Sequence, residues 1–311
     1  MARVVFLGTP SFAVPILAGL YSQHQVLAVI TQPDQAGGRG RQELCIPPVK
    51  AWAAIHGLMV LQPDRLRRDV QTICIIRGLK PEVLVLAAYG QILRQNVLSI
   101  APHGCIGVHA SLLPRLRGAA PIATAILQGE AQTGISLMLT DVGMDTGPVI
   151  ARSVVTLTPT ETTSSLTDKL AACGATTIVE ILPRWLAGEI TPESQDDTLA
   201  TFAPPLKKEQ GVLDWSQTAV ELDRHVRALN PWPGTFTHHA GAMLKVLAAA
   251  PLTEMRPAQE PGCVVNLPMG IGVTTGQGVL LLQIVQPAGK RAMSALDYAR
   301  GHRGFYCAQL N

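Results

Sequence analysis

A histidine and an aspartate that follow two different apolar runs could move a proton together. His109 ends the run that begins at Cys105, and Asp145 lies in a glycine-bearing loop after the run from Gly134 to Leu139. A carboxylate beside an imidazole favours the charged ring or fixes its tautomer, and such a ring can exchange a proton near neutral pH. Taken singly, a histidine at a strand end is usually structural and an Asp/Gly loop is usually a turn. The chemistry therefore depends on the fold bringing the two together.

The turn Gly8-Thr9-Pro10-Ser11 is a second candidate site, because it follows an apolar run and opens a helix-like segment. It resembles a phosphate-binding turn at a helix N-terminus. The G-x-G-x-x-G spacing of a dinucleotide site is absent, since Pro10 stands where the second glycine would approach a pyrophosphate. A tight turn with Thr9 or Ser11 capping the helix is the more common structure for such a sequence.

The elements that would position these residues alternate between strand-like and helix-like segments. Apolar runs predict strands at 3–7, 25–31, 83–88, 105–108 and 134–139. Helical spacing predicts helices at 10–21, 47–56, 64–78, 121–128 and 164–187. This alternation predicts an α/β fold, a doubly wound and mostly parallel sheet of Rossmann-like type. Its ligand should lie beyond the carboxyl ends of the strands, where the strand order reverses.

The last third of the chain predicts a second domain of a different class. Residues 188–208 are rich in Pro, Thr, Asp and Gln and lack periodicity, which is typical of an interdomain connection. We therefore expect a first domain at 1–203, with its connection from about residue 188, and a second at 204–311. Helices are predicted at 217–229 and 294–300. Short runs between them predict a small OB-like β-barrel, at 234–237, 243–248, 262–265, 271–275 and 278–285.

Composition excludes several classes of protein. Hydrophobic residues make up 47% of the chain and charged residues 15%, which excludes a disordered protein. No apolar run reaches membrane-spanning length and Val4 already begins a strand-like run, so we expect a cytoplasmic protein without membrane contact. The six cysteines form no C-x-x-C pair and no cluster with histidine, and we expect reduced thiols and no metal site. Residues 204–311 hold 10 Lys and Arg against 7 Asp and Glu, a weak indication of nucleic-acid binding.

Several runs of the first domain resemble, in order, the signatures of methionyl-tRNA formyltransferases. They are VVFLGTPSFAVPIL, TQPDQAGGRGR, AAYGQIL, GCIGVHASLLPRLRGAAPI and GMDTGPVI. The runs LDWSQTAVELDRHVRALNPWPGTFT and GKRAMSALDYARG resemble the carboxy-terminal domain of the same family, so the resemblance covers nearly the whole chain. HASLLP and DTG are shared with other 10-formyltetrahydrofolate-dependent transferases. ALNPWPG and the predicted barrel favour the methionyl-tRNA formyltransferases over these other transferases.

The resemblance implies an enzyme that transfers the formyl group of 10-formyltetrahydrofolate to the amino group of initiator methionyl-tRNA. It implies that His109 and Asp145 are catalytic and that no metal is required. Attack of the amine on the formyl carbon creates an oxyanion and a nitrogen that must lose a proton, and these two side chains would serve both needs. The residues expected to contact folate are Ser111, Leu112, Leu113, Pro114, Ala88, Tyr89, Gly90, Gln91 and Ile92, together with Asp141 of the aspartate loop.

The chain departs from the family pattern two residues before the histidine. The family has an asparagine there, as N-V-H, whereas this chain has Gly107. Losing one oxyanion donor typically costs about 2.7 to 4 kcal/mol, or roughly 10²- to 10³-fold in rate. Two alternatives stay open: formylation of another amine, such as a sugar nucleotide or ribonucleotide, and a catalytically impaired homologue that binds folate or RNA.

Four basic residues are candidates for contact with tRNA. Arg39 and Arg41 lie among glycines in a segment that resembles the family's basic loop near the tRNA acceptor end. Arginine can bind a phosphate through two parallel hydrogen bonds. Lys207 and Lys208 could contact the RNA backbone from the second domain, although such residues are most often simply solvated. We expect a monomer that binds initiator tRNA and the folate donor.

Overall fold

The computed structural model describes residues 1–37, 43–255 and 258–311, which form two compact units. The first unit comprises Met1–Pro121, Gln132–Leu157 and Thr167–Ala203, and the second comprises Ile122–Ala131, Thr158–Leu166 and Pro204–Asn311. Arg39 and Arg41 lie outside the described residues. Within the described residues, every helix is too short or too polar to cross a membrane.

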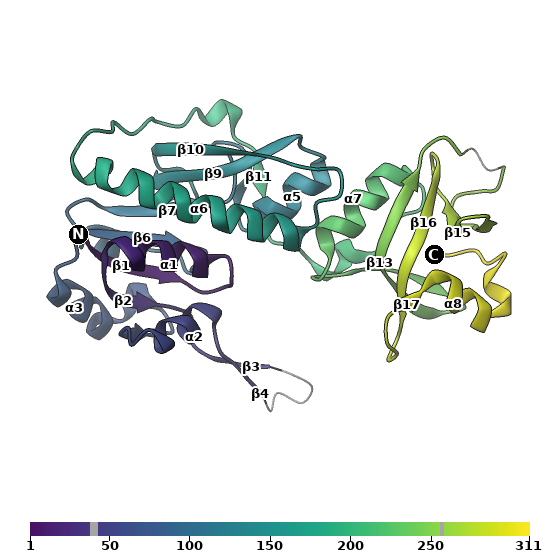
Figure 1. The fold of residues 1–311 in the computed structure, drawn as a ribbon, viewed down its shortest axis with the longest axis horizontal. Helices are drawn as coiled ribbons and strands as arrows, with labels where there is room; N and C mark the ends of the chain where they lie inside the picture. The colour runs from purple at the N-terminus through teal and green to yellow at the C-terminus, as the bar shows by residue number, and fades with distance from the viewer. Residues whose placement is uncertain (38–42, 256–257) are drawn as a thin grey trace. The chain divides into compact units, whose positions relative to one another are not determined.

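A seven-stranded sheet forms the centre of the first unit (Figure 1). Its order is β10-β9-β7-β6-β1-β2-β5, with β1 at Arg3–Gly8, β2 at Gln25–Ile30, β5 at Val60–Leu61, β6 at Val83–Ala87, β7 at Cys105–His109, β9 at Gln132–Leu139 and β10 at Val149–Thr156. The five neighbouring strands β5, β2, β1, β6 and β7 are parallel to one another. Strand β9 runs antiparallel to β7, and β10 runs antiparallel to β9. The strand order reverses between β1 and β6, so a ligand is expected beyond their carboxyl ends.

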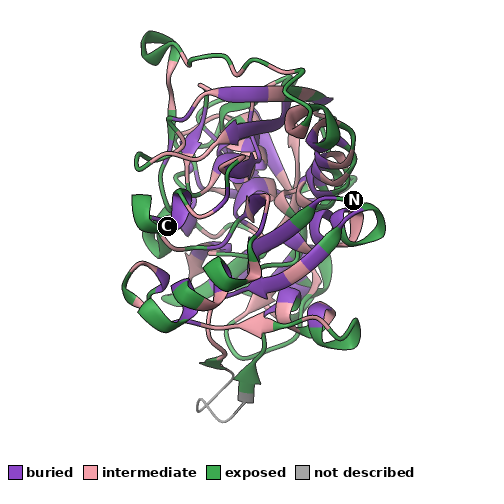
Figure 2. Ribbon diagram, turned by 90° about the vertical axis from the view of Figure 1, so that its left-hand side faces the viewer, coloured by how far each residue is buried: buried purple, intermediate pink, exposed green. Residues whose placement is uncertain are grey.

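Helices cover both faces of this sheet, as the continuous apolar runs of its parallel strands require. They are α1 (Ala13–Gln23), α2 (Pro48–Ile55), η1 (Leu66–Arg68), α3 (Val70–Leu79), α4 (Gln95–Leu98) and α6 (Thr163–Leu186). Val5 and Leu84 share one core with Ile73 of α3. On the other face α1 and α6 pack closely, because a side chain at Gly19 of α1 would meet Val179 of α6 at 3.2 Å. The strands are accordingly buried, while the outer turns of the helices are exposed (Figure 2).

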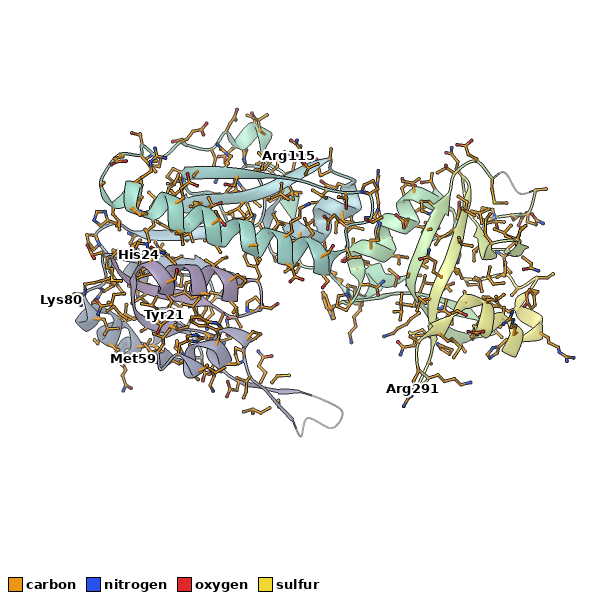
Figure 3. All side chains as sticks on the ribbon, in the orientation of Figure 1. Tyr21, His24, Met59, Lys80, Arg115 and Arg291 are labelled. Carbon is orange, nitrogen blue, oxygen red and sulfur yellow. The ribbon has the colours of Figure 1, made fainter. Side chains whose placement is uncertain are left out.

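Short elements complete the first unit. They are the hairpin of β3 (Gln35–Gly37) and β4 (Glu43–Cys45), the parallel pair of β8 (Arg117–Gly118) and β11 (Phe202–Ala203), and η2 (Asp197–Leu199). His24, labelled in Figure 3, follows α1 directly and is buried, with 9% of its surface exposed.

A six-stranded antiparallel sheet forms the second unit. Its path is β12 (Thr235–His239), β13 (Ala242–Leu252), β16 (Val279–Pro287), β15 (Gly270–Thr274) and β14 (Val264–Leu267), with β17 (Met293–Ser294) on β16. The helical elements are α5 (Pro121–Gln128), η3 (Lys208–Gly211), α7 (Ala219–Leu229), α8 (Ala295–Gly301) and η4 (Arg303–Phe305). Leu222 and Val226 of α7 pack with Val246 and Phe305 in the core of this sheet.

The predicted fold class is confirmed: an α/β unit with a mostly parallel sheet is followed by a small antiparallel β unit. In the described residues, the second sheet is open, because its end strands β12 and β14 do not pair with each other. The sequence prediction omitted β10. This edge strand has one exposed face and carries Arg152 and Ser153, which interrupt its apolar run.

Candidate active site

His109 and Asp145 lie next to each other, with 3.6 Å between His109 Nδ1 and Asp145 Oδ2. His109 is the last residue of β7, and it pairs with Ser136 of β9 beyond the point where the pairing of β7 with β6 ends. The backbone N–H of Gly118 donates to the same Asp145 oxygen at 2.9 Å. The structure thus brings together the imidazole and the carboxylate that sequence reasoning paired.

The aspartate loop reaches His109 by a route that differs from the expected one. Sequence reasoning placed the loop at the carboxyl edge of a parallel strand, but β9 is antiparallel to β7. The loop leaves β9 level with the other end of β7, where the Thr140 N–H donates to the Cys105 carbonyl at 2.7 Å. To reach His109, the loop passes along the side of β7 that carries Gly107. A Cβ atom added at Gly107 would lie 3.0 Å from Thr140 Oγ1, the side chain at the start of the loop.

The surroundings of His109 assign a role to each ring nitrogen. Nε2 lies 2.9 Å from the carbonyl oxygen of Leu116. A carbonyl oxygen only accepts, so Nε2 carries the hydrogen. Nδ1 is therefore the nitrogen at which a proton is gained or lost, and it faces the Asp145 carboxylate. The ring is 9% exposed, which leaves little room for bulk water.

Position 107 is closely packed on the side that faces the aspartate loop. The glycine is buried within β7, and residues two apart on a strand point to the same face, so position 107 and His109 share it. A Cβ there would lie 3.2 Å from Met138 Cε. Asp141 does not reach outward from the loop, because both of its carboxylate oxygens accept from Thr146 Oγ1, at 2.8 and 2.9 Å.

Ser136, which sequence reasoning missed, holds the loop that follows His109. Its hydroxyl accepts from the Leu113 N–H at 2.9 Å and donates to the Ser111 carbonyl at 2.7 Å. Ser136 is fully buried on β9 and pairs with His109 across the two strands. The Ser111 hydroxyl is likewise engaged, since it donates to the Arg115 carbonyl at 2.6 Å. Leu112 and Pro114 are half-buried and remain available to a ligand, whereas the Leu113 side chain is buried.

The segment after β6 lies at the point where the strand order reverses. Ala88 and Gly90 are exposed and have positive φ angles of 47° and 87°. The Tyr89 side chain is buried in the core, and burial raises the pKa of its hydroxyl. Gln91 is engaged with the chain, because its Nε2 donates to the Pro63 carbonyl at 3.1 Å. Ile92 is 64% exposed.

The turn after β1 is tied to this segment rather than acting as a helix cap. Thr9 Oγ1 donates to the Tyr89 carbonyl at 2.9 Å, and Gln32 Nε2 donates to the same oxygen at 3.2 Å. The first turn of α1 has Phe12 at its N-cap without any side-chain cap. The predicted capping by Thr9 or Ser11 is therefore wrong, because Thr9 is used to join β1 to β6.

Cys105, which lies on the same strand as His109, is not a candidate nucleophile. Burial raises the pKa of Cys105 to about 12, so its thiol stays protonated and is a poor nucleophile. Across residues 1–37, 43–255 and 258–311, no group of three or more His, Cys, Asp or Glu side chains is placed to hold a metal ion.

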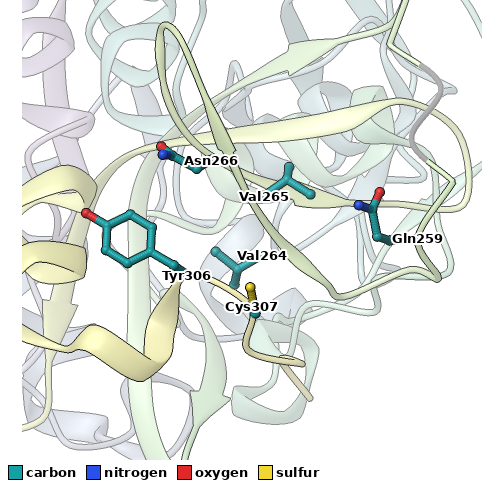
Figure 4. A pocket seen from close by; sticks show the side chains of 6 residues that line it. All are labelled: Gln259, Val264, Val265, Asn266, Tyr306 and Cys307. Carbon is teal, nitrogen blue, oxygen red and sulfur yellow. The ribbon is translucent and has the colours of Figure 1, made fainter.

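The second unit has an open hollow of about 530 Å³, lined by Gln259, Val264, Val265, Asn266, Tyr306 and Cys307 (Figure 4). Lys207 and Lys208 are exposed at η3 of the same unit.

Family models match both parts of the chain. A formyl transferase model matches residues 2–182, and a model of the formyl transferase C-terminal domain matches residues 205–303. Solved structures share the fold at low identity. HypX from Aquifex aeolicus in complex with tetrahydrofolic acid has a TM-score of 0.66 and 17% identity, covering 98% of this chain and 47% of that one. The N-formyltransferase from Helicobacter canadensis, solved with folinic acid and dTDP-3-aminofucose, has a TM-score of 0.68 and 16% identity, covering 91% and 99%.

Relatives of similar length are much closer in sequence. The methionyl-tRNA formyltransferase of Roseiflexus castenholzii is 46% identical over 303 residues, which is 97% of this chain and 96% of the relative. That of Bacillus subtilis is 45% identical over 304 residues, covering 97% and 95%. Identity at this level spans both units and both family models. The chain therefore belongs to the methionyl-tRNA formyltransferase family.

Proposed function

We propose that the protein transfers the formyl group of 10-formyltetrahydrofolate to the free amino group of initiator methionyl-tRNA. The observation that carries the proposal is the His109–Asp145 pair, with 3.6 Å between ring nitrogen and carboxylate oxygen, in a chain whose full-length relatives are named for this activity. A catalytic domain at residues 1–203 would perform the chemistry and a domain at residues 204–311 would hold tRNA.

The pair can serve both needs of the reaction. The methionyl nitrogen forms a bond to the formyl carbon, and the carbonyl electrons move onto the formyl oxygen. The nitrogen must then lose a proton, which His109 Nδ1 accepts, and the resulting imidazolium faces Asp145. Collapse of the tetrahedral species breaks the bond to N10 of the folate, which takes up a proton. The Leu116 carbonyl holds the opposite nitrogen and so keeps Nδ1 directed at the reaction.

The residues present fit a folate donor. Ala88 and Gly90 expose backbone at the switch point of the sheet, and Leu112 and Pro114 add partly open apolar surface after the adjacent strand. We propose these four as pterin and folate contacts. Tyr89, Ser111 and Leu113 would act indirectly, because their side chains are buried or internally bonded. Gln91 and Asp141 would shape the two loops from within. The exposed Ile92 lies at the rim of the same segment.

Two other functions are the alternatives. Formylation of an amino sugar is favoured only by fold likeness, since the Helicobacter canadensis structure was solved with such a nucleotide at 16% identity. A homologue with impaired catalysis is suggested by Gly107, where no side chain can donate to an oxyanion. Arg39, Arg41, Lys207 and Lys208 would contact tRNA in the proposed function, and the protein would act in the cytoplasm as a monomer.

A direct assay tests the proposal. Purified protein is mixed with charged initiator tRNA and 10-formyltetrahydrofolate, and formyl-methionine is measured after release from the tRNA. Parallel reactions contain an amino-sugar nucleotide instead of tRNA. We expect formyl-methionine only. Formylation of the sugar without formylation of methionine would overturn the assignment, and binding of tRNA and folate without turnover would support the impaired homologue.

A further inference from the structure

Gln195 lies in the segment that sequence reasoning treated as an interdomain connection, yet its side chain contacts both sides of the His109–Asp145 pair. Its Nε2 donates to the backbone carbonyls of Asp145, at 2.9 Å, and Gly147, at 2.7 Å. Its Oε1 accepts from Arg117 Nε at 3.1 Å and from Arg117 Nη2 at 2.8 Å. The Gln195 amide thus makes two hydrogen bonds through its nitrogen and two through its oxygen.

The chemistry of the neighbours fixes the orientation of this amide. An arginine only donates and a backbone carbonyl oxygen only accepts, so a single orientation satisfies all four contacts. A glutamate at position 195 would keep both contacts to Arg117 but could not donate to the carbonyls of Asp145 and Gly147. The two halves of the contact set can therefore be separated by one substitution of nearly equal shape.

On one side, Gln195 holds an uncommon backbone conformation. Asp145 has a φ of 57°, in the left-handed region that residues other than glycine rarely adopt. Such a conformation persists only where the surroundings enforce it. The two accepting carbonyls belong to Asp145 itself and to Gly147, so one amide group holds the turn that directs the carboxylate at His109.

On the other side, Gln195 holds the strand that contacts both members of the pair. Arg117 is 4% exposed and stands between Leu116, whose carbonyl holds His109 Nε2, and Gly118, whose N–H holds Asp145 Oδ2. The Arg117 N–H donates to the Thr201 carbonyl at 2.9 Å. Arg117 also donates to an acidic partner, Asp197, whose side chain is 82% exposed.

We infer that Gln195 is a positioning residue for formyl transfer, which fixes His109 against Asp145 by tying the Asp145 turn to Arg117. The inference rests on the proposed function. Gln195 acts through backbone and through Arg117, so its loss should misplace the pair and leave the folate and tRNA contacts in place. A misplacement of about 1 Å can cost about 10²-fold in rate. The effect should therefore fall on kcat and not on KM.

Three proteins test this inference: the wild type, Gln195→Glu and the control Asp197→Asn. We expect Gln195→Glu to lower kcat by about 10- to 100-fold, with both KM values within about threefold. The melting temperature should fall as well, because the carbonyls of Asp145 and Gly147 lose their donor. Asp197→Asn removes only the charge of an exposed partner of Arg117, and exposed ion pairs contribute little, so its kcat should match the wild type. If the glutamate variant folds poorly, Gln195→Met takes its place. Methionine is similar in length and has no donors, so this variant should show the same loss of kcat.

A spectroscopic measurement separates this inference from the proposed function. The ¹⁵N resonances of the His109 ring should change in Gln195→Glu and stay constant in Asp197→Asn, with or without substrate. Unchanged ring resonances, a wild-type kcat in Gln195→Glu, or an equal loss in Asp197→Asn would overturn the role of Gln195. A wild type that transfers no formyl group would overturn the proposed function alone, because the ring resonances still report on the position of His109.

Discussion

The carboxylate oxygen of Asp145 that faces His109 Nδ1 at 3.6 Å also accepts the backbone N–H of Gly118 at 2.9 Å. The Gly118 N–H therefore holds in place the Asp145 oxygen that faces the His109 ring. The distance to Nδ1 exceeds that of a direct hydrogen bond, so in this structure the carboxylate acts on the ring through its charge rather than through a hydrogen bond.

Replacing Asp145 by asparagine tests the carboxylate without changing its shape. Asparagine tolerates the left-handed conformation at this position, and its amide oxygen can still accept from Gly118. Since general acid–base catalysis typically contributes 10²- to 10⁴-fold, we expect kcat to fall by about 10²-fold or more, with little change in the melting temperature. His109→Asn should produce a loss of similar size, and the double variant should lose little beyond either single one. A drop below about threefold in Asp145→Asn would remove the carboxylate from the chemistry. Single-turnover formylation measures both.

Ser136→Ala tests whether the loop after His109 is a folate contact. The change leaves the Leu113 N–H and the Ser111 carbonyl without their partner, and an unsatisfied buried group costs about 1–3 kcal/mol. We expect the KM for 10-formyltetrahydrofolate to rise about tenfold while the KM for methionyl-tRNA stays constant. Ser153→Ala is the control, because that hydroxyl accepts from Thr177 on a neighbouring helix and does not contact the loop. Equal effects of the two substitutions on folate KM would contradict the prediction.

The sequence predicts five strands of the central sheet, β1, β2, β6, β7 and β9, because each is a short apolar run. It misses the two-residue strand β5 and the edge strand β10. It also identifies His109 and Asp145, since each follows such a run. It does not predict the direction of β9, because an apolar run reads the same for a parallel and an antiparallel neighbour. The path by which the Asp145 loop reaches His109 follows from that direction and was therefore missed.

Gln195 and Ser136 show what local sequence cannot give. Gln195 lies in a stretch without periodicity, and its partners are far away along the chain, at Arg117 and Asp145. Ser136 interrupts the apolar run of β9 with a single hydroxyl, which carries no motif. Both matter through tertiary hydrogen bonds, so only the fold reveals them. The basic segment with Arg39 and Arg41 lies outside the described residues and stays a prediction.

The stability of the protein should fall as the pH drops below about 6.5, because of His24. Burial, and secondarily the nearby N-terminal charge, lowers the pKa of His24 below its usual 6.5. Its Nδ1 accepts from the Ala2 N–H at 3.4 Å, and its Nε2 is buried without a partner. Below pH 6.5 the unfolded chain binds a proton at this residue and the folded chain does not, so the free energy of unfolding decreases until the folded pKa is reached.

Urea unfolding between pH 8 and pH 5 measures this dependence. His24→Asn keeps an acceptor for Ala2 and removes the titration, so its unfolding free energy should depend less on pH than that of the wild type. Some slope should remain, since burial and the nearby His302 also lower the pKa of His239. An identical slope in His24→Asn and the wild type would refute the assignment.

Gly107→Asn tests whether the missing family asparagine limits the rate. A Cβ at this position would lie 3.0 Å from Thr140 Oγ1 and 3.2 Å from Met138 Cε, so both side chains must give by a few tenths of an ångström. Met138 can do so because the contact is made by the end of a flexible side chain. The new amide would extend on the His109 face of β7, where it could donate to the formyl oxygen as charge develops. We expect the single-turnover rate to rise about 10²-fold. Gly107→Ala is the matched control, since it introduces the same Cβ contacts without a donor, and it should show no gain. If alanine accelerates the reaction as much as asparagine, or if a folded asparagine variant shows no gain, Gly107 does not limit catalysis and another donor stabilises the oxyanion.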